Sequence, residues 1–144
     1  LQQYANQHQL RGGPQGETPS SNDPIDDIYY VSEKTSGALD HCLFAFFVGC
    51  HTGLSNAAGE NLLDEATEKG ADCAAGFECT LYVDVLGEGL EYFWEYVMWH
   101  DYYVDAAAVQ TIFDLRDAHD GYDGGWDSYV SRDNVMVEPA RWGD

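Results

Sequence analysis

A run of six apolar residues at positions 43–48 constrains the fold of this chain more than any other feature. The run has the length of a β-strand and contains no polar residue, so neither of its faces suits water. Such strands are typical of parallel sheets that helices cover on both sides. The run ends in Gly49-Cys50-His51-Thr52-Gly53, where the glycines allow a sharp turn. The sequence therefore predicts a buried strand with Cys50 at its carboxyl end.

Helical and strand-like segments alternate after this run. Apolar residues recur at helical spacing three times, and short apolar stretches lie between and after them. The expected helices span 62–69, with Gly70 as the residue after the helix end, 88–100, and a third that begins after Asp105 as N-cap; the expected strands span 71–77 and 135–137. This order predicts an α/β fold with a mainly parallel sheet flanked by helices.

The chain divides into a polar amino-terminal segment and one domain. Residues 1–27 are rich in Gln, Gly, Pro, Ser and Asn and predict an extended or loop segment. Residues 28–144 begin with a β-prone run at 28–31 and are long enough for a single core without a disulfide or metal. The four cysteines lack the spacing of a zinc site, so we expect reduced thiols, no metal, no cofactor and a cytoplasmic location.

The charge of the chain excludes several classes of partner. Twenty-six Asp and Glu face six Lys and Arg, and the net charge is −20. That charge opposes a compact state at low ionic strength, but molar salt shortens the screening length to about 3 Å. The composition resembles that of proteins from salt-accumulating halophiles; an ordinary acidic protein is the alternative. Without a basic patch, nucleic acid and anionic lipid are disfavoured, and no apolar run reaches the roughly 20 residues that span a bilayer.

Cys50 is the best candidate for chemistry. Catalytic groups of α/β proteins gather at the carboxyl ends of the strands, where Cys50 is expected. Main-chain amides in the turn around Gly49, His51 and Gly53 are suited to stabilise a thiolate or an oxyanion. The alternative is a cysteine that packs as a small apolar side chain.

The segment 46–53, Phe-Phe-Val-Gly-Cys-His-Thr-Gly, resembles the strand and cysteine turn of the caspase-like cysteine peptidases, which include gingipains, clostripain and CHAT domains. The similarity continues through 62–77 and 93–118 and covers about residues 38–120. It implies a caspase-hemoglobinase-like fold and a Cys–His dyad in which Cys50 attacks a peptide carbonyl.

The histidines depart from the pattern of this family, in which the base commonly lies in a His-Gly pair. The chain has no His-Gly pair. His41 lies at the wrong end of the strand, and His51, as the neighbour of Cys50, is expected to point away from it. His8 is the remaining candidate base, loosely at caspase spacing. Because few residues precede His8, we expect a domain truncated at its amino end or one that has lost the dyad.

Two functional hypotheses follow. The first is a caspase-like cysteine peptidase, or a truncated or inactive relative of one, adapted to high salt. The second is a non-catalytic caspase-fold module that binds a protein or peptide. An open sheet edge would serve the second, and a homodimer is one complex that such an edge allows.

Overall fold

The computed structural model describes residues 9–11, 28–31 and 34–137. A small antiparallel pair comes first, made of β1 (Gln9–Arg11) and β2 (Ile28–Tyr30), and β2 confirms the strand expected at 28–31. The rest of the predicted 1–27 segment lies outside the described residues. The elements that follow are β3 (Ala45–Phe46), α2 (Leu62–Glu68), β4 (Ala74–Phe77), α3 (Val83–Trp99), α4 (Val104–Ala118), the 3₁₀ turn η3 (Trp126–Ser128) and β5 (Tyr129–Arg132).

The order of strands and helices confirms an α/β fold, but the sheet is mixed rather than mainly parallel. Its strand order is β3-β4-β5, with β3 parallel to β4 and β5 antiparallel to it. A single helix, α2, returns the chain so that β4 runs in the direction of β3. Two antiparallel helices, α3 and α4, return the chain to the end at which β4 stopped. Consequently β5 runs back along β4.

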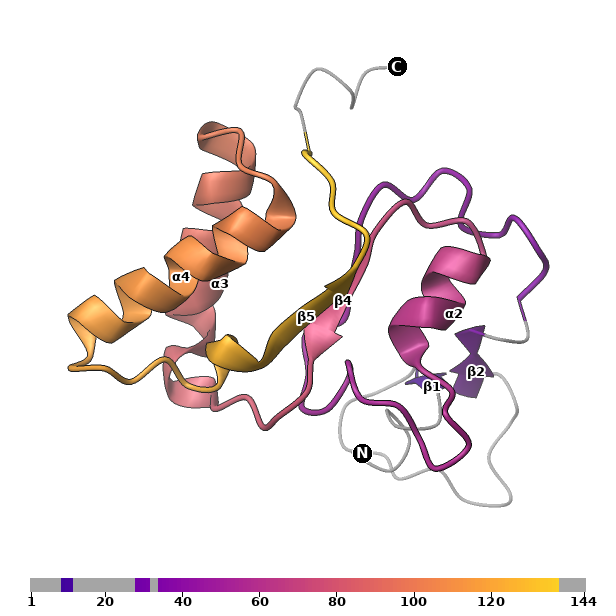
Figure 1. The fold of residues 1–144 in the computed structure, drawn as a ribbon, viewed down its shortest axis with the longest axis horizontal. Coiled ribbons are helices and arrows are strands. Elements are labelled where there is room, and N and C mark those ends of the chain that lie inside the picture. Colours follow the sequence, from indigo (N-terminus) through magenta and orange to yellow (C-terminus); the bar gives the residue numbers. More distant parts are fainter. Residues whose placement is uncertain (1–8, 12–27, 32–33, 138–144) are drawn as a thin grey trace.

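Helices cover both faces of this sheet, with α2 on one side and the α3–α4 pair on the other (Figure 1). Alternate strand residues divide between the two layers. The smaller core, on the α2 side, contains Leu63, Ala66, Ala71 and Ala74, with Ala45, Phe47 and Val130 against it. The larger core, on the other side, includes Phe77, Phe93, Val97, Leu115 and Trp126, with Phe44, Phe46 and Tyr129 against it.

The strand at 43–48 is less enclosed than predicted. Both of its faces pack against helices, yet only β4 pairs with β3 among the described strands. Its apolar residues are half-buried, and Val48 is exposed. The helices thus cover both faces as expected, but the strand is buried less than expected because β3 lies at an edge of the described sheet.

The helix ends follow the expected chemistry in one case and depart from it in two. The side chain of Asn61 caps α2, and Gly70 follows its C-cap with φ 115°, a conformation that favours glycine. The helix α3 begins at Val83, five residues earlier than predicted. The helix α4 begins at Val104, so Asp105 lies in its first turn rather than at the cap.

The last strand was also expected at the wrong place. It spans Tyr129–Arg132, whereas Met136 forms only a single bridge, with Tyr103. The apolar spacing at 135–137 instead serves contacts with the start of α4, where Val104 N–H donates to Val135 O. In the described ranges, no helix is both long and apolar enough to cross a membrane.

Candidate functional site: the Cys50 turn and the edge of β3

The five residues 49–53, here the Cys50 turn, follow β3 at its carboxyl end and fold back onto the end of β4. The N–H of His51 donates to Cys79 O at 3.2 Å, and the N–H of Gly53 donates to Phe77 O at 2.9 Å. His51 has φ 60°, in the left-handed region that residues with a Cβ seldom adopt. The turn is therefore held close to the sheet.

The thiol of Cys50 is half-buried and bonded to one main-chain peptide. Leu81 N–H donates to Cys50 Sγ at 3.3 Å, and the thiol donates to Leu81 O at 3.6 Å. The sulfur also lies against the larger core. Within the described ranges, both hydrogen bonds of this thiol go to Leu81, and none goes to a histidine.

A threonine missed by the sequence reasoning lies at the centre of the turn. The hydroxyl of Thr52 donates to Phe47 O at 2.7 Å and to Gly49 O at 3.0 Å. It also accepts the N–H of Phe77 at 3.1 Å. In the sequence, the only signal for Thr52 is its position. It lies between Cys50 and Gly53, in the turn that follows the apolar run at 43–48.

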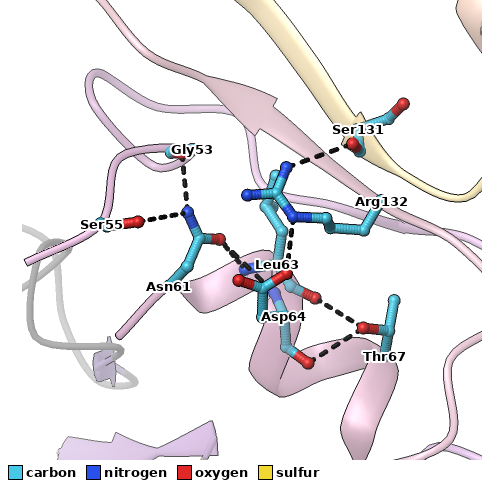
Figure 2. Close-up of polar contacts among 8 residues, drawn as sticks. All are labelled: Gly53, Ser55, Asn61, Leu63, Asp64, Thr67, Ser131 and Arg132. Carbon is cyan, nitrogen blue, oxygen red and sulfur yellow. Dashed lines mark hydrogen bonds and ion pairs between the residues drawn. The ribbon is translucent and has the colours of Figure 1, made fainter. Parts of the chain in front are cut away.

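The far end of the turn is tied to α2 (Figure 2). The side-chain amide of Asn61, which is buried, donates to Gly53 O at 2.9 Å and to Ser55 Oγ at 3.4 Å. Its carbonyl oxygen accepts the N–H of Leu63 at 2.8 Å. One side chain thus caps α2 and fixes the end of the Cys50 turn.

An ion pair links α2 to the opposite edge strand. The guanidinium of Arg132 on β5 donates to Asp64 Oδ1 at 2.5 Å and to Ser131 O at 3.3 Å (Figure 2). Both side chains are about two-fifths exposed, so the pair contributes little to the free energy of unfolding. The pair places the side chain of Arg132 against Asp64 of α2.

The predicted catalytic groups are brought together only in part. Cys50 lies where it was expected, at the carboxyl end of β3. His8 lies outside the described residues, and His41 is exposed at the other end of the strand. The amides of His51 and Gly53 already donate to β4 and its continuation, so an oxyanion would have to displace those bonds.

The other described histidines pair with glutamates on α3. His119 Nε2 lies 2.6 Å from Glu88 Oε2, and the hydroxyl of Tyr92 donates to Glu88 Oε1 at 3.0 Å. The bond with His119 is the main cause that holds the pKa of the Glu88 carboxyl below its usual value. His100 lies 3.7 Å from Glu95. These contacts join or cap helices and lie apart from Cys50 in the sequence and the hydrogen-bond network.

A cluster of polar side chains around Cys73 and Asp105 lies between β4, β5 and α4. Burial first, and then Asp105 and Asp133, raise the pKa of the Cys73 thiol to about 12. The carboxylate of Asp105 accepts the hydroxyls of Tyr129 and Ser131 at 3.1 and 2.7 Å. Cys73 is therefore a protonated packing residue, as expected. Within the described residues, no three or more His, Cys, Asp or Glu side chains gather closely enough to hold a metal ion.

The outer edge of β3 is the second feature of the site. Ala45 and Phe47 donate their N–H groups to Cys73 O and Ala75 O of the β4 segment, both at 2.9 Å. The hydrogen-bonding groups of alternate residues in a strand point to opposite sides. The main-chain N–H and C=O groups of Phe46 and Val48 therefore point away from β4. No hydrogen bond to these outward groups comes from any residue in the described part of the chain.

Aromatic side chains continue this edge onto α3. The ring of Phe44 lies 6.3 Å from that of Trp94, and the ring of Phe46 lies 6.4 Å from it. Trp94 and Val48 are 38% and 39% exposed. The outward main-chain groups are thus bordered by apolar surface.

Comparison of the chain with family models, with curated proteins and with solved structures found no significant match.

Proposed function

We propose that this chain is a non-catalytic protein-interaction module of caspase-like fold that binds an extended segment of a partner at the outer edge of β3. The proposal is based on the main-chain N–H and C=O groups of Phe46 and Val48. These groups point outward and form no hydrogen bond with any described residue. An edge of this kind binds another strand through main-chain hydrogen bonds.

The side chains around the edge favour an apolar partner strand. Phe44, Phe46 and Trp94 form a continuous aromatic group along β3 and α3. A strand laid beside β3 would cover their exposed parts with alternate side chains. Burying this surface would add a hydrophobic contribution to the main-chain bonds.

At low ionic strength, charge favours a partner strand with basic flanks. The net charge of the chain is −20, and Asp123 is the only acidic side chain that is fully buried in the described ranges. Most of the other described carboxylates are at least partly exposed and attract a basic segment while repelling an acidic one. The partner is therefore an apolar strand with basic flanks.

Synthetic peptides test this proposal without knowledge of the natural partner. The probe is an alternating Val-Thr peptide with lysine flanks, compared with the same peptide flanked by glutamate. We expect the lysine peptide to bind more tightly by calorimetry, with a preference that shrinks as KCl rises. Val48→Pro, which removes an outward N–H, should weaken binding, whereas Val48→Ala, which keeps it, should retain most of it.

Two results would contradict the proposal, and a third would identify the partner. Equal binding of the lysine peptide to Val48→Pro and wild type, or no binding to either, would contradict the proposal. A dimer in sedimentation that Val48→Pro dissociates would instead identify the partner strand as that of a second copy.

A caspase-like cysteine peptidase, or an inactive relative, is the second candidate. The place of the Cys50 thiol at the carboxyl end of β3, beside the end of β4, favours it. Its test is hydrolysis of a mixture of fluorogenic peptides in molar KCl. Activity that Cys50→Ser and His8→Ala each abolish would establish the dyad, and activity that survives Cys50→Ser would exclude it.

Adaptation to high salt, in the cytoplasm of a salt-accumulating organism, is part of this proposal. The surface position of the described carboxylates supports it, because salt would screen their mutual repulsion. We expect the melting temperature to rise markedly from dilute buffer to molar KCl. An unchanged melting temperature would contradict the adaptation.

A further inference from the structure

The hydroxyl of Thr52 forms hydrogen bonds with three main-chain groups around the Cys50 turn. Its one hydroxyl proton is shared between Phe47 O and Gly49 O, and its oxygen accepts the N–H of Phe77. The first contact reaches the end of the β3 segment, the second lies within the turn, and the third reaches β4. Thr52 is 9% exposed, so water does not readily replace these bonds.

We infer that Thr52 is the positioning residue that clamps the Cys50 turn and the carboxyl end of β3 against β4. The inference deepens the proposed function, because it names the residue that holds the edge beside Val48 in place. It rests on the proposed function in one respect only, because it takes the outer edge of β3 as the binding site. The geometry of the clamp depends on no partner.

The surroundings of Thr52 are shaped to fit its hydroxyl. A Cβ on Gly76 of β4 would lie 2.7 Å from Thr52 Oγ1, and a Cβ on Gly49 would lie 3.1 Å from Thr52 Cγ2. The strand and the turn therefore approach more closely than residues with side chains would permit. This close approach brings the N–H of Phe77 within reach of the hydroxyl.

The clamp also determines how the Cys50 thiol is held. The turn bends between Gly49 and Thr52, and Cys50 lies between these two residues with its sulfur on the Leu81 main chain. When the hydroxyl is lost, the N–H of Phe77 remains buried without its side-chain acceptor. That state favours opening of the turn, and opening releases the thiol to solvent.

The alkylation rate of Cys50 measures this opening. The experiment treats the folded full chain in molar KCl with iodoacetamide and follows each cysteine by mass spectrometry. Cys79, which is exposed, serves as the internal reference, and the buried Cys73 reports global unfolding. The variants are Thr52→Val, which keeps the shape and removes the hydroxyl, and Thr52→Ser, which keeps the hydroxyl.

The matched control is a second threonine. The hydroxyl of Thr67 donates to Leu63 O and Asp64 O within α2 (Figure 2), so Thr67→Val makes the same chemical change away from the turn. We expect alkylation of Cys50 relative to Cys79 to rise about tenfold in Thr52→Val, the scale set by a buried group left unpaired. The ratio should stay near the wild-type value in Thr52→Ser and Thr67→Val.

Three results would overturn the inference: an unchanged ratio in Thr52→Val, the same rise in Thr52→Ser, or the same rise in Thr67→Val. If Thr52→Val does not fold, Gly76→Ala supplies the test, because its Cβ would lie 2.7 Å from the hydroxyl and 3.1 Å from Gly53 N and so displaces the hydroxyl together with the turn. An unchanged Cys50 ratio in folded Gly76→Ala would also overturn the inference. No peptide is present in this assay, so its failure is distinct from a failure of strand binding.

Discussion

Gly87 and Gly89 lie two residues apart on α3, and the same substitution at each should have opposite effects on stability. Gly89 is buried, and a Cβ there would lie 2.3 Å from Nε1 of Trp126 and 2.5 Å from its Cε2. Gly87 is exposed, and a Cβ there would meet nothing within 4 Å. The indole of Trp126 is fully buried in the larger core, so it has little room to move away from a new methyl group.

The expected magnitudes follow from two opposing contributions. Replacing glycine with alanine in a helix interior stabilises by about 0.5 to 1 kcal/mol, and Gly87→Ala should show this gain. Overpacking a core typically costs about 1 to 3 kcal/mol. Gly89→Ala should therefore lower the free energy of unfolding, by up to about 2.5 kcal/mol after the helical gain is subtracted.

Urea unfolding followed by circular dichroism, at one fixed KCl concentration, measures both variants against wild type. The variant Trp126→Phe supplies the second arm, because the smaller ring makes room beside residue 89. In the double variant, Gly89→Ala should cost less than it does alone, which a double-mutant cycle detects. If Gly89→Ala is as stabilising as Gly87→Ala, Trp126 does not pack against Gly89 of α3 as described.

The remaining predictions concern pH. Burial raises the pKa of the Cys73 thiol to about 12, so the unfolded chain releases this proton at lower pH than the folded chain does. Between about pH 9 and pH 10, the free energy of unfolding of wild type should therefore fall by about 1 kcal/mol more than that of Cys73→Ala; equal slopes in urea unfolding would contradict this. His119 lowers the pKa of the Glu88 carboxyl, so the stability it gives is present above the usual pKa of a glutamate and is lost as pH falls through the lowered value. Glu88→Gln should lower the melting temperature at pH 7 more than its neighbour control Glu91→Gln does, and a difference that persists at pH 2 would refute the assignment.

The helices and their order were predictable because the pattern that specifies them is local. The apolar spacing in α2, α3 and α4 reflects the faces that these helices bury, and Gly70 ends α2 by its own conformational freedom. The direction of β5 was predictable in principle, since two successive helices without a strand between them return the chain to the end it left.

The position of β5 was harder to predict. Its sequence, Tyr-Val-Ser-Arg, alternates between the two helix layers, and Ser131 and Arg132 bond to carboxylates on α4 and α2. Polar side chains that find partners distant in the sequence carry no local apolar signal. The more apolar stretch at 135–137 therefore gave the stronger and misleading pattern.

The site was predictable only at Cys50. The strand end and the glycines around it placed the turn correctly, because both features are local. The contacts that hold the turn join residues far apart in the chain, as with Thr52 and Phe77 or Asn61 and Gly53. Hydrogen bonds of this kind depend on the register of β3 and β4, which one sequence does not reveal.

Amide hydrogen exchange along the β3 segment tests the central claim, an open outer edge, most directly. The N–H groups of Ala45 and Phe47 donate to the β4 segment, whereas those of Phe46 and Val48 point outward. We predict slow exchange at Ala45 and Phe47 and fast exchange at Phe46 and Val48 in the free protein, with the outward pair slowed when the lysine-flanked peptide is added. Equal protection of all four amides in the free protein would mean that the edge is already covered, and it would contradict the proposed strand-binding function.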